Sequence, residues 1–228
     1  MNKYTGFLLS YLKYGDNDAV LHCYTKESGF QSFFVKGIYS SKNKKKAFLS
    51  PMNELSFTVL NHNSHSDLLR ATKIEMVEVE SCFQDVRYNT VIFFVSEFLN
   101  QILKNEGKND SMYIEILNFK DNLKKSNFYA HYFFLIKILE ILGLAPLISE
   151  NKFLNLEKGV FQDDISPEII NEEVSILWKK ILDDKAIDLE MNKLTKKKLL
   201  DSILLYYNYH FPDFRYPKSL EIINQIFE

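Results

Sequence analysis

The chain has 228 residues, of which 46% are hydrophobic and 14% aromatic, with only 7 Gly and 5 Pro. This length and apolar content allow a substantial buried core in one large domain or two small ones, and they exclude a disordered or linker-rich chain. The formal net charge of −2 excludes a uniformly basic protein, and the two cysteines, Cys23 and Cys82, are too few for a disulfide framework or a zinc ligand set.

The N-terminus lacks the charged start, long apolar run and small-residue cleavage site of a signal peptide. The most apolar stretch, residues 128–142, contains His131, Lys137 and Glu140, so we expect a buried helix there and not a membrane span. These patterns predict a cytoplasmic protein that does not associate with membranes.

The first part of the chain has short runs rich in β-branched and aromatic residues, separated by turn-forming residues, which predicts strands. We expect five strands, at residues 5–13, 19–24, 30–38, 53–60 and 68–79. Five short strands without a long intervening helix are typical of a small closed barrel such as the OB fold, with an SH3-like barrel as the alternative. We therefore predict an OB-type nucleic-acid-binding domain over residues 1–80.

After Cys82 the hydrophobic period changes from two residues to about 3.6 residues, which predicts an all-α domain over residues 81–228. We expect helices over residues 88–103 and 128–142, with Gly143 ending the second in a left-handed conformation. Two further helices should follow Ser166-Pro167 and Thr195, which are candidate capping residues. The predicted fold class is α+β, with the barrel first and the helical domain second.

No motif for nucleotide-driven or hydrolytic chemistry is present: the sequence has no GxGxxG or GxxxxGK[ST] loop, no HExxH helix and no GxSxG elbow. His62 and His65 lie in a polar loop and lack further metal ligands, so we interpret them as solvated turn residues. His131 and His210 fit core or boundary positions better than catalytic ones. We expect neither an enzyme nor a cofactor.

One segment combines concentrated positive charge with an aromatic residue. Residues 28–53 contain five lysines and no acidic residue, namely Lys36, Lys42, Lys44, Lys45 and Lys46. Lysines neutralise phosphates, and Tyr39 between them offers a stacking face for an unpaired base. A solvated charged loop is the alternative, but on a five-stranded barrel the DNA-binding interpretation is favoured. Arg70 is a weaker candidate because it lies within a predicted strand.

A second basic cluster lies at the predicted start of a helix and comprises Lys193, Lys196, Lys197 and Lys198. Cations there oppose the helix dipole at a cost of about 0.3–1 kcal/mol each, so the cluster is consistent with ordinary surface. The functional alternative is an anion site for DNA or for an acidic peptide of a partner protein.

Several motifs resemble those of the RecO family of bacterial recombination mediators. At the N-terminus they are residues 6–10 (GFLLS), 14–18 (YGDND), 21–25 (LHCYT) and 27–29 (ESG). The most specific match is residues 35–39 (VKGIY) followed by residues 49–52 (LSPM). The far end is similar to the family's closing pattern through residues 205–207 (LYY), His210, residues 212–214 (PDF) and 218–220 (KSL).

The resemblance implies an N-terminal OB domain, a helical C-terminal domain, and binding and annealing of single-stranded DNA. It also implies work with RecR and single-strand binding protein to load RecA. Many family members hold a four-cysteine zinc site, but residues 155–161 keep only the Gly-Val-Phe hairpin pattern and have no cysteine, so no metal is expected. The family's loop arginines are lysines here, which favours point-charge contacts over bidentate ones.

The sequence therefore supports one main hypothesis and one alternative. In the first, the lysine loop and the barrel hold the backbone of single-stranded DNA, which screens the repulsion between complementary strands so that they pair. In the second, the chain is a protein-interaction scaffold without DNA binding, whose helical domain holds a peptide.

Overall fold

A computed structural model describes residues 1–40, 44–60, 68–77, 85–164, 170–183 and 192–227. The chain forms two compact units, Met1–Tyr113 and Ile114–Glu228, which are described separately. None of the helices within the described residues has the length and apolar character needed to cross a membrane.

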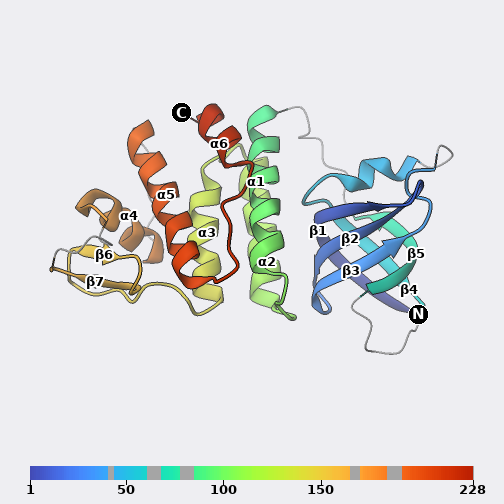
Figure 1. Ribbon diagram of the computed structural model, residues 1–228, viewed down its shortest axis with the longest axis horizontal. Helices are drawn as coiled ribbons and strands as arrows, with labels where there is room; N and C mark the ends of the chain where they lie inside the picture. The colour runs from blue at the N-terminus through green and yellow to red at the C-terminus, as the bar shows by residue number, and fades with distance from the viewer. Residues whose placement is uncertain (41–43, 61–67, 78–84, 165–169, 184–191, 228) are drawn as a thin grey trace. The chain divides into compact units, whose positions relative to one another are not determined.

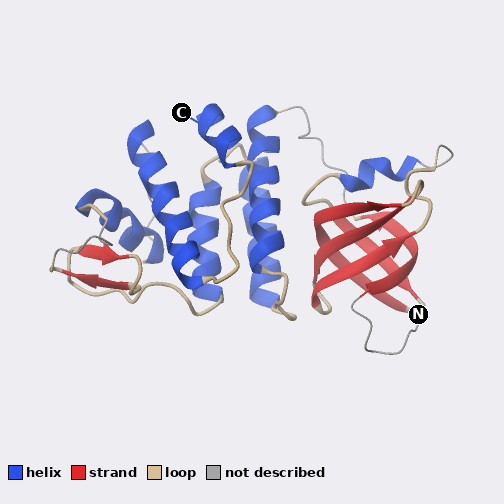
Figure 2. Cartoon of the chain, in the orientation of Figure 1, coloured by secondary structure: helices blue, strands red, loops and turns tan. Residues whose placement is uncertain are grey.

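The first unit contains a closed five-stranded barrel (Figures 1 and 2). Its strands are β1 (Asn2–Tyr14), β2 (Asp18–Thr25), β3 (Gly29–Val35), β4 (Glu54–Val59) and β5 (Leu68–Met76). The strand order is β1-β2-β3-β5-β4, with β1 closing the barrel by pairing with both β2 and β4. Only the pairing of β3 with β5 is parallel. The predicted OB-type barrel is confirmed.

Alternating burial along the strands explains the barrel's core. In β2, Ala19, Leu21 and Cys23 are fully buried, and Phe33 of β3 stacks on Phe57 of β4 with ring centroids 4.0 Å apart. A short 3₁₀ helix, η1 (Lys44–Leu49), adds Phe48 and Leu49 to this core, together with Ile38.

Strand β3 ends at Val35, three residues before the predicted end. Gly37 has φ of +69°, a left-handed conformation that breaks the extended ladder. Ile38 is nevertheless buried in the barrel core, which explains why its apolar character suggested a longer strand.

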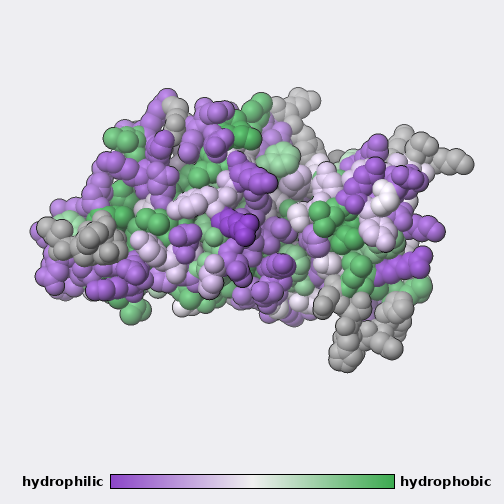
Figure 3. Space-filling view, in the orientation of Figure 1, coloured by the Kyte–Doolittle hydropathy of each residue, from purple (hydrophilic) through white to green (hydrophobic). Residues whose placement is uncertain are grey.

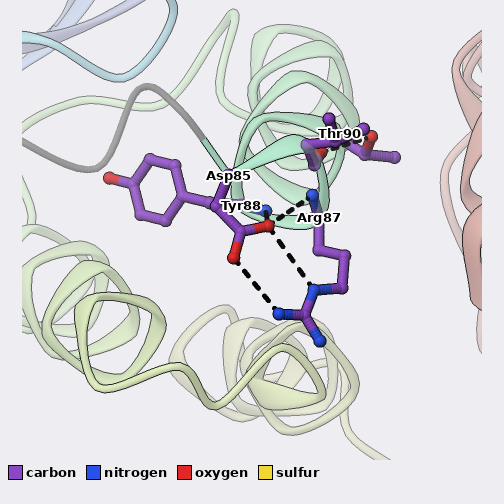
Figure 4. Close-up of polar contacts among 5 residues, drawn as sticks. Asp85, Arg87, Tyr88 and Thr90 are labelled. Atoms are coloured by element: carbon purple, nitrogen blue, oxygen red, sulfur yellow. Dashed lines mark hydrogen bonds and ion pairs between the residues drawn. The ribbon is translucent and has the colours of Figure 1, made fainter.

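Helix α1 (Val86–Ile102) belongs to the first unit and begins at a side-chain cap (Figure 4). The Asp85 carboxylate accepts hydrogen bonds from the backbone N–H of Arg87 at 2.8 Å and of Tyr88 at 3.4 Å, and it pairs with the Arg87 guanidinium at 3.3 Å. The hydrogen bond from the Arg87 side chain is the main reason that the pKa of Asp85 is lowered. The helix packs on β1, where Ser96 Oγ donates to the Leu9 carbonyl at 2.6 Å.

The second unit is mainly helical, as predicted. Its elements are most of α2 (Asp110–Lys124), α3 (Ala130–Ile141), β6 (Phe153–Asn155), β7 (Val160–Gln162), α4 (Glu172–Leu182), α5 (Lys193–His210) and α6 (Leu220–Phe227). Helix α3 contacts both α4 and α5, and it is buried on nearly all sides, as expected for a central helix. The short β6-β7 hairpin turns at Gly159, φ +65°, where the sequence has the Gly-Val-Phe pattern.

The ends of these helices confirm one predicted cap and correct another. Gly143 has φ of +70° and follows α3, as predicted. Asn192, not Thr195, caps α5, because the Asn192 side chain accepts from the Thr195 N–H at 2.9 Å; Thr195 lies inside the first turn. Helix α4 is capped by Asn171, and the predicted cap Ser166-Pro167 lies outside the described residues.

Candidate nucleic-acid interface

The segment that follows β3 is tied to the turn between β1 and β2. The backbone N–H of Gly37 donates to Asp18 Oδ1 at 2.7 Å, and the N–H of Tyr39 donates to the Asn17 carbonyl at 2.9 Å. The left-handed backbone of Gly37 makes this turn possible, and Ser40 closes it by donating to the Gly37 carbonyl. These bonds place the start of the lysine loop beside the far end of β1.

Tyr39 lies at the centre of a small cationic cluster. Its ring is half-buried against the barrel core, and its centroid lies 5.7 Å from Lys13 Nζ and 5.9 Å from Lys46 Nζ. Partial burial, with a smaller effect of nearby Tyr11, raises the pKa of the Tyr39 hydroxyl, so the ring stays neutral and attracts both ammonium groups. Tyr39 therefore orders two cations in addition to any contact it makes with a base.

The other predicted loop cations are described only in part. Lys36 directly follows β3 and is exposed, Lys45 is half-buried, and Lys46 is exposed. Within the described residues these three are not ion-paired with any carboxylate. Lys44 begins η1, and Lys42 lies outside the described residues. Their assignment to DNA binding stays a prediction.

Arg70 lies on the outer surface of the barrel, next to an aromatic residue of the neighbouring strand. It is exposed on β5, directly opposite Phe34 of β3 in the parallel register. Phe34 in turn meets Tyr14 of β1 edge to face, with ring centroids 5.7 Å apart. Lys13, Tyr14 and Phe34 could not be selected from the sequence, because their proximity depends on which strands pair.

The surface of the first unit has a cationic region and a separate region with aromatic residues. In Figure 3, hydrophilic residues cover the region of η1, and hydrophobic residues emerge over the neighbouring strands of the barrel. A single-stranded nucleic acid presents both charges and apolar base faces, so a surface that offers cations beside exposed rings can contact both.

The second basic cluster is at the start of α5, as predicted, but its members point to different neighbours. Lys196 Nζ lies 4.0 Å from the centroid of the Tyr129 ring. Lys198 instead lines a cavity of about 240 Å³ together with Asp201, and the apolar part of the lining includes Leu156, Val174 and Leu205. Lys193 and Lys197 are exposed. The mainly apolar lining suits an apolar group more directly than it suits an extended polyanion.

The histidines of the described residues have structural environments. His131 is fully buried, Nδ1 donates to the Phe128 carbonyl at 2.9 Å, and burial lowers its pKa to about 4. His210 Nε2 donates to the Leu156 carbonyl at 2.9 Å. His62 and His65 lie outside the described residues. Across the described part of the chain, no three His, Cys, Asp or Glu side chains are grouped so that they could hold a metal ion.

Comparisons with known proteins match both units. The family model described as "Recombination protein O N terminal" matches residues 1–79. The chain is 30% identical to the DNA repair protein RecO of Flavobacterium psychrophilum, over 99% of this chain and 98% of that protein. It is also 30% identical to the RecO of Christiangramia forsetii over 96% of each chain, and 24% identical to that of Bacteroides fragilis over the whole of both. The similarity therefore extends well beyond the barrel.

Proposed function

The chain belongs to the RecO family of DNA repair proteins, and from this membership we propose that it is a recombination mediator that binds and anneals single-stranded DNA. With RecR and single-strand binding protein, it helps to load RecA onto the strand. It acts in the cytoplasm and by binding alone, without a cofactor or a catalytic step.

The observation that carries this proposal is the set of cations at one end of the barrel. Lys13 and Lys46 flank the Tyr39 ring, and Lys36 and Lys45 extend the positive surface without ion-paired carboxylates among the described residues. Ammonium groups held together repel one another, so a polyanion that binds them relieves this repulsion. A phosphate backbone also releases its condensed counterions on binding, which adds to the affinity.

Annealing follows from the same electrostatics. Two complementary strands repel each other because each carries one charge per about 3.4 Å of its length. A surface that neutralises part of one strand lowers this barrier, and lysines suit the task because they contact phosphates as mobile point charges. No bond is made or broken, so no catalytic residue is required.

The partner part of the proposal is supported by the cavity beside α5. An apolar side chain of a partner peptide fits the apolar part of this cavity, where Leu156, Val174 and Leu205 lie, and an acidic group beside it would meet Lys198 at the rim that also holds Asp201. We assign this site to a segment of single-strand binding protein. If the barrel does not bind DNA, the same cavity favours the alternative function, a scaffold that holds protein partners.

The test is fluorescence anisotropy of a labelled oligothymidylate, titrated with the full chain over a range of salt concentrations. If about four cations contact phosphates, log affinity should fall with log salt with a slope of about −3. The double variant Lys45→Ala/Lys46→Ala should lower affinity and reduce the slope by about 1.4. The control, Lys125→Ala/Lys152→Ala, removes two exposed lysines of the second unit and should change neither.

A salt-independent affinity, or equal effects of the two double variants, would exclude the cationic end of the barrel as the DNA site. Absence of any DNA binding by the unmodified chain, together with binding of a peptide from single-strand binding protein, would support the scaffold instead. The peptide is measured in a separate anisotropy titration, with the peptide carrying the label.

A further inference from the structure

We infer that the bases of the bound strand stack on the outer face of the barrel, on an aromatic platform formed by Tyr14 and Phe34 next to Arg70. This inference rests on the proposed function, because it assigns the contacts of the unpaired bases that accompany the phosphates. It names residues outside the lysine loop as the determinants of binding to single strands.

The strand register brings the platform together. Phe34 of β3 pairs with Val20 of β2 on one side and with Arg70 of β5 on the other. Ala19 and Val35, the neighbours of Val20 and Phe34, are in the barrel core, so by alternation Val20, Phe34 and Arg70 lie on the outer face. The edge-to-face contact with Phe34 adds Tyr14, the last residue of β1, to the same face.

Tyr14 is the member of the platform best suited to receive a base. It is 63% exposed, although the Phe34 ring holds it edge to face at an interplanar angle of 84°. A ring already fixed by packing loses little conformational freedom when a base stacks on it. Tyr39, by contrast, is half-buried and already has two ammonium groups near its ring.

The outer face offers a second pair of rings further along the same strands. His22 of β2 and Phe30 of β3 are stacked, with ring centroids 5.8 Å apart and an interplanar angle of 16°. Both are half-buried and lie at outward positions of their strands. Lys104, which follows α1, is near enough to help lower the pKa of His22, although burial is the larger cause.

The charges around these rings select the occupant. Arg70 lies beside Phe34, Lys36 follows the end of β3, and Lys104 is near the His22 end. An exposed ring, Tyr14, and partly exposed rings beside it, all bordered by cations, suit a ligand that alternates aromatic faces with negative charges, which is an unpaired polynucleotide. In a duplex the base faces are covered by their neighbours, so the platform distinguishes single strands from double strands.

The experiment compares two ligands that carry the same number of phosphates, an oligothymidylate and a strand of equal length made of abasic sites. The unmodified chain should bind the oligothymidylate more tightly, and Tyr14→Ala should weaken this binding about tenfold per lost stack. The same variant should leave binding of the abasic strand and the salt slope unchanged, because it removes no cation. Tyr14→Phe keeps the ring and should restore full affinity.

Tyr209→Ala is the matched control, because Tyr209 is an exposed tyrosine, 42% accessible, on α5 of the second unit. It should bind both ligands like the unmodified chain. A Tyr14→Trp variant provides an independent readout, since stacking on a base should quench the fluorescence of the new indole and leave that of Trp178 unchanged.

The outcomes separate this inference from the proposed function. If the unmodified chain binds the oligothymidylate and the abasic strand equally, or if Tyr14→Ala binds normally with an unchanged preference, the platform is wrong while the cationic site stands. If the unmodified chain binds neither ligand, the proposed function itself fails. If Tyr14→Ala loses affinity for both ligands equally, its effect is structural and the platform is again refuted.

Discussion

Trp178 provides a direct test of how the second unit is held together. Its side chain is fully buried, and its Nε1–H donates to Ser202 Oγ at 2.9 Å; the Ser202 hydroxyl in turn donates to the Leu199 carbonyl at 2.7 Å. Ser202→Ala removes the acceptor and leaves a buried N–H without its partner. The desolvation cost of such a group predicts a loss of about 1–3 kcal/mol in the free energy of unfolding.

The measurement is urea denaturation followed by tryptophan fluorescence. Trp178 is the chain's single tryptophan, so the signal reports the second unit. Lys152→Ala, at an exposed position of the second unit, serves as the control and should change the free energy of unfolding by less than about 0.5 kcal/mol.

A double-mutant cycle separates the energy of the hydrogen bond between Trp178 and Ser202 from the other effects of removing the Ser202 hydroxyl. In a Trp178→Phe background there is no N–H to leave unsatisfied, so Ser202→Ala should cost less there when unfolding is followed by circular dichroism. If Ser202→Ala costs under about 0.5 kcal/mol with Trp178 in place, or costs the same in both backgrounds, the reasoning is refuted.

Three further changes test other parts of the fold. His131 is buried with its pKa lowered from 6.5 to about 4, so the unfolded chain takes up the proton first as pH falls. The free energy of unfolding should therefore decrease by about 3 kcal/mol as the pH falls from about 7 to about 4, and urea titrations of His131→Leu should show a smaller decrease. Gly29→Ala would place a Cβ 2.3 Å from the Gly107 backbone at a residue with φ of +76°, and thermal melts should show the barrel destabilised by more than about 2 kcal/mol. Gly15 has φ of +58° but open space around it, so Gly15→Ala should lower the free energy of unfolding by only about 1 kcal/mol. Asn192→Ala removes the cap of α5 and should cost about 0.5–2 kcal/mol by the same fluorescence assay; an unchanged midpoint would mean that the cap contributes nothing.

The barrel was predictable because each of its strands has a recognisable pattern in its own short segment of sequence. Alternation in residues 19–24 and 30–35, and turns rich in Gly, Asn and Asp, are sufficient to count strands and to suggest closure. The errors fall where tertiary contacts decide the outcome. Ile38 is apolar because it packs into the core after the chain has left β3, so composition alone extended the strand too far.

Among the helices, α2 was absent from the predictions although it is 15 residues long. The buried face of α2 includes a lysine, and two apolar residues, Ile114 and Leu117, lie on its exposed side, so its pattern is a weaker signal than the apolar run of α3. The buried positions are Met112, Tyr113, Ile116, Phe119, Lys120 and Leu123. Thr195 was a reasonable cap by residue type, but Asn192 occupies the position that the helix geometry requires.

The candidate site was predictable only as far as it is continuous in the sequence. A run of lysines is visible without a structure, and so is the tyrosine among them. Two features depend on strand order and register. One is the pairing of Phe34 with Arg70, and the other is the contact of the segment after β3 with the turn between β1 and β2. These features belong to the barrel and not to any segment of it.

Strand β1 has a consequence for how the protein is made. It pairs at its start with β4, so that Asn2 lies opposite Val59, and at its end with β2. A chain synthesised from its N-terminus therefore exposes one edge of its first strand until the fourth has emerged from the ribosome. Unpaired edges recruit foreign strands, so the first strand of the nascent chain is open to aggregation until β4 arrives.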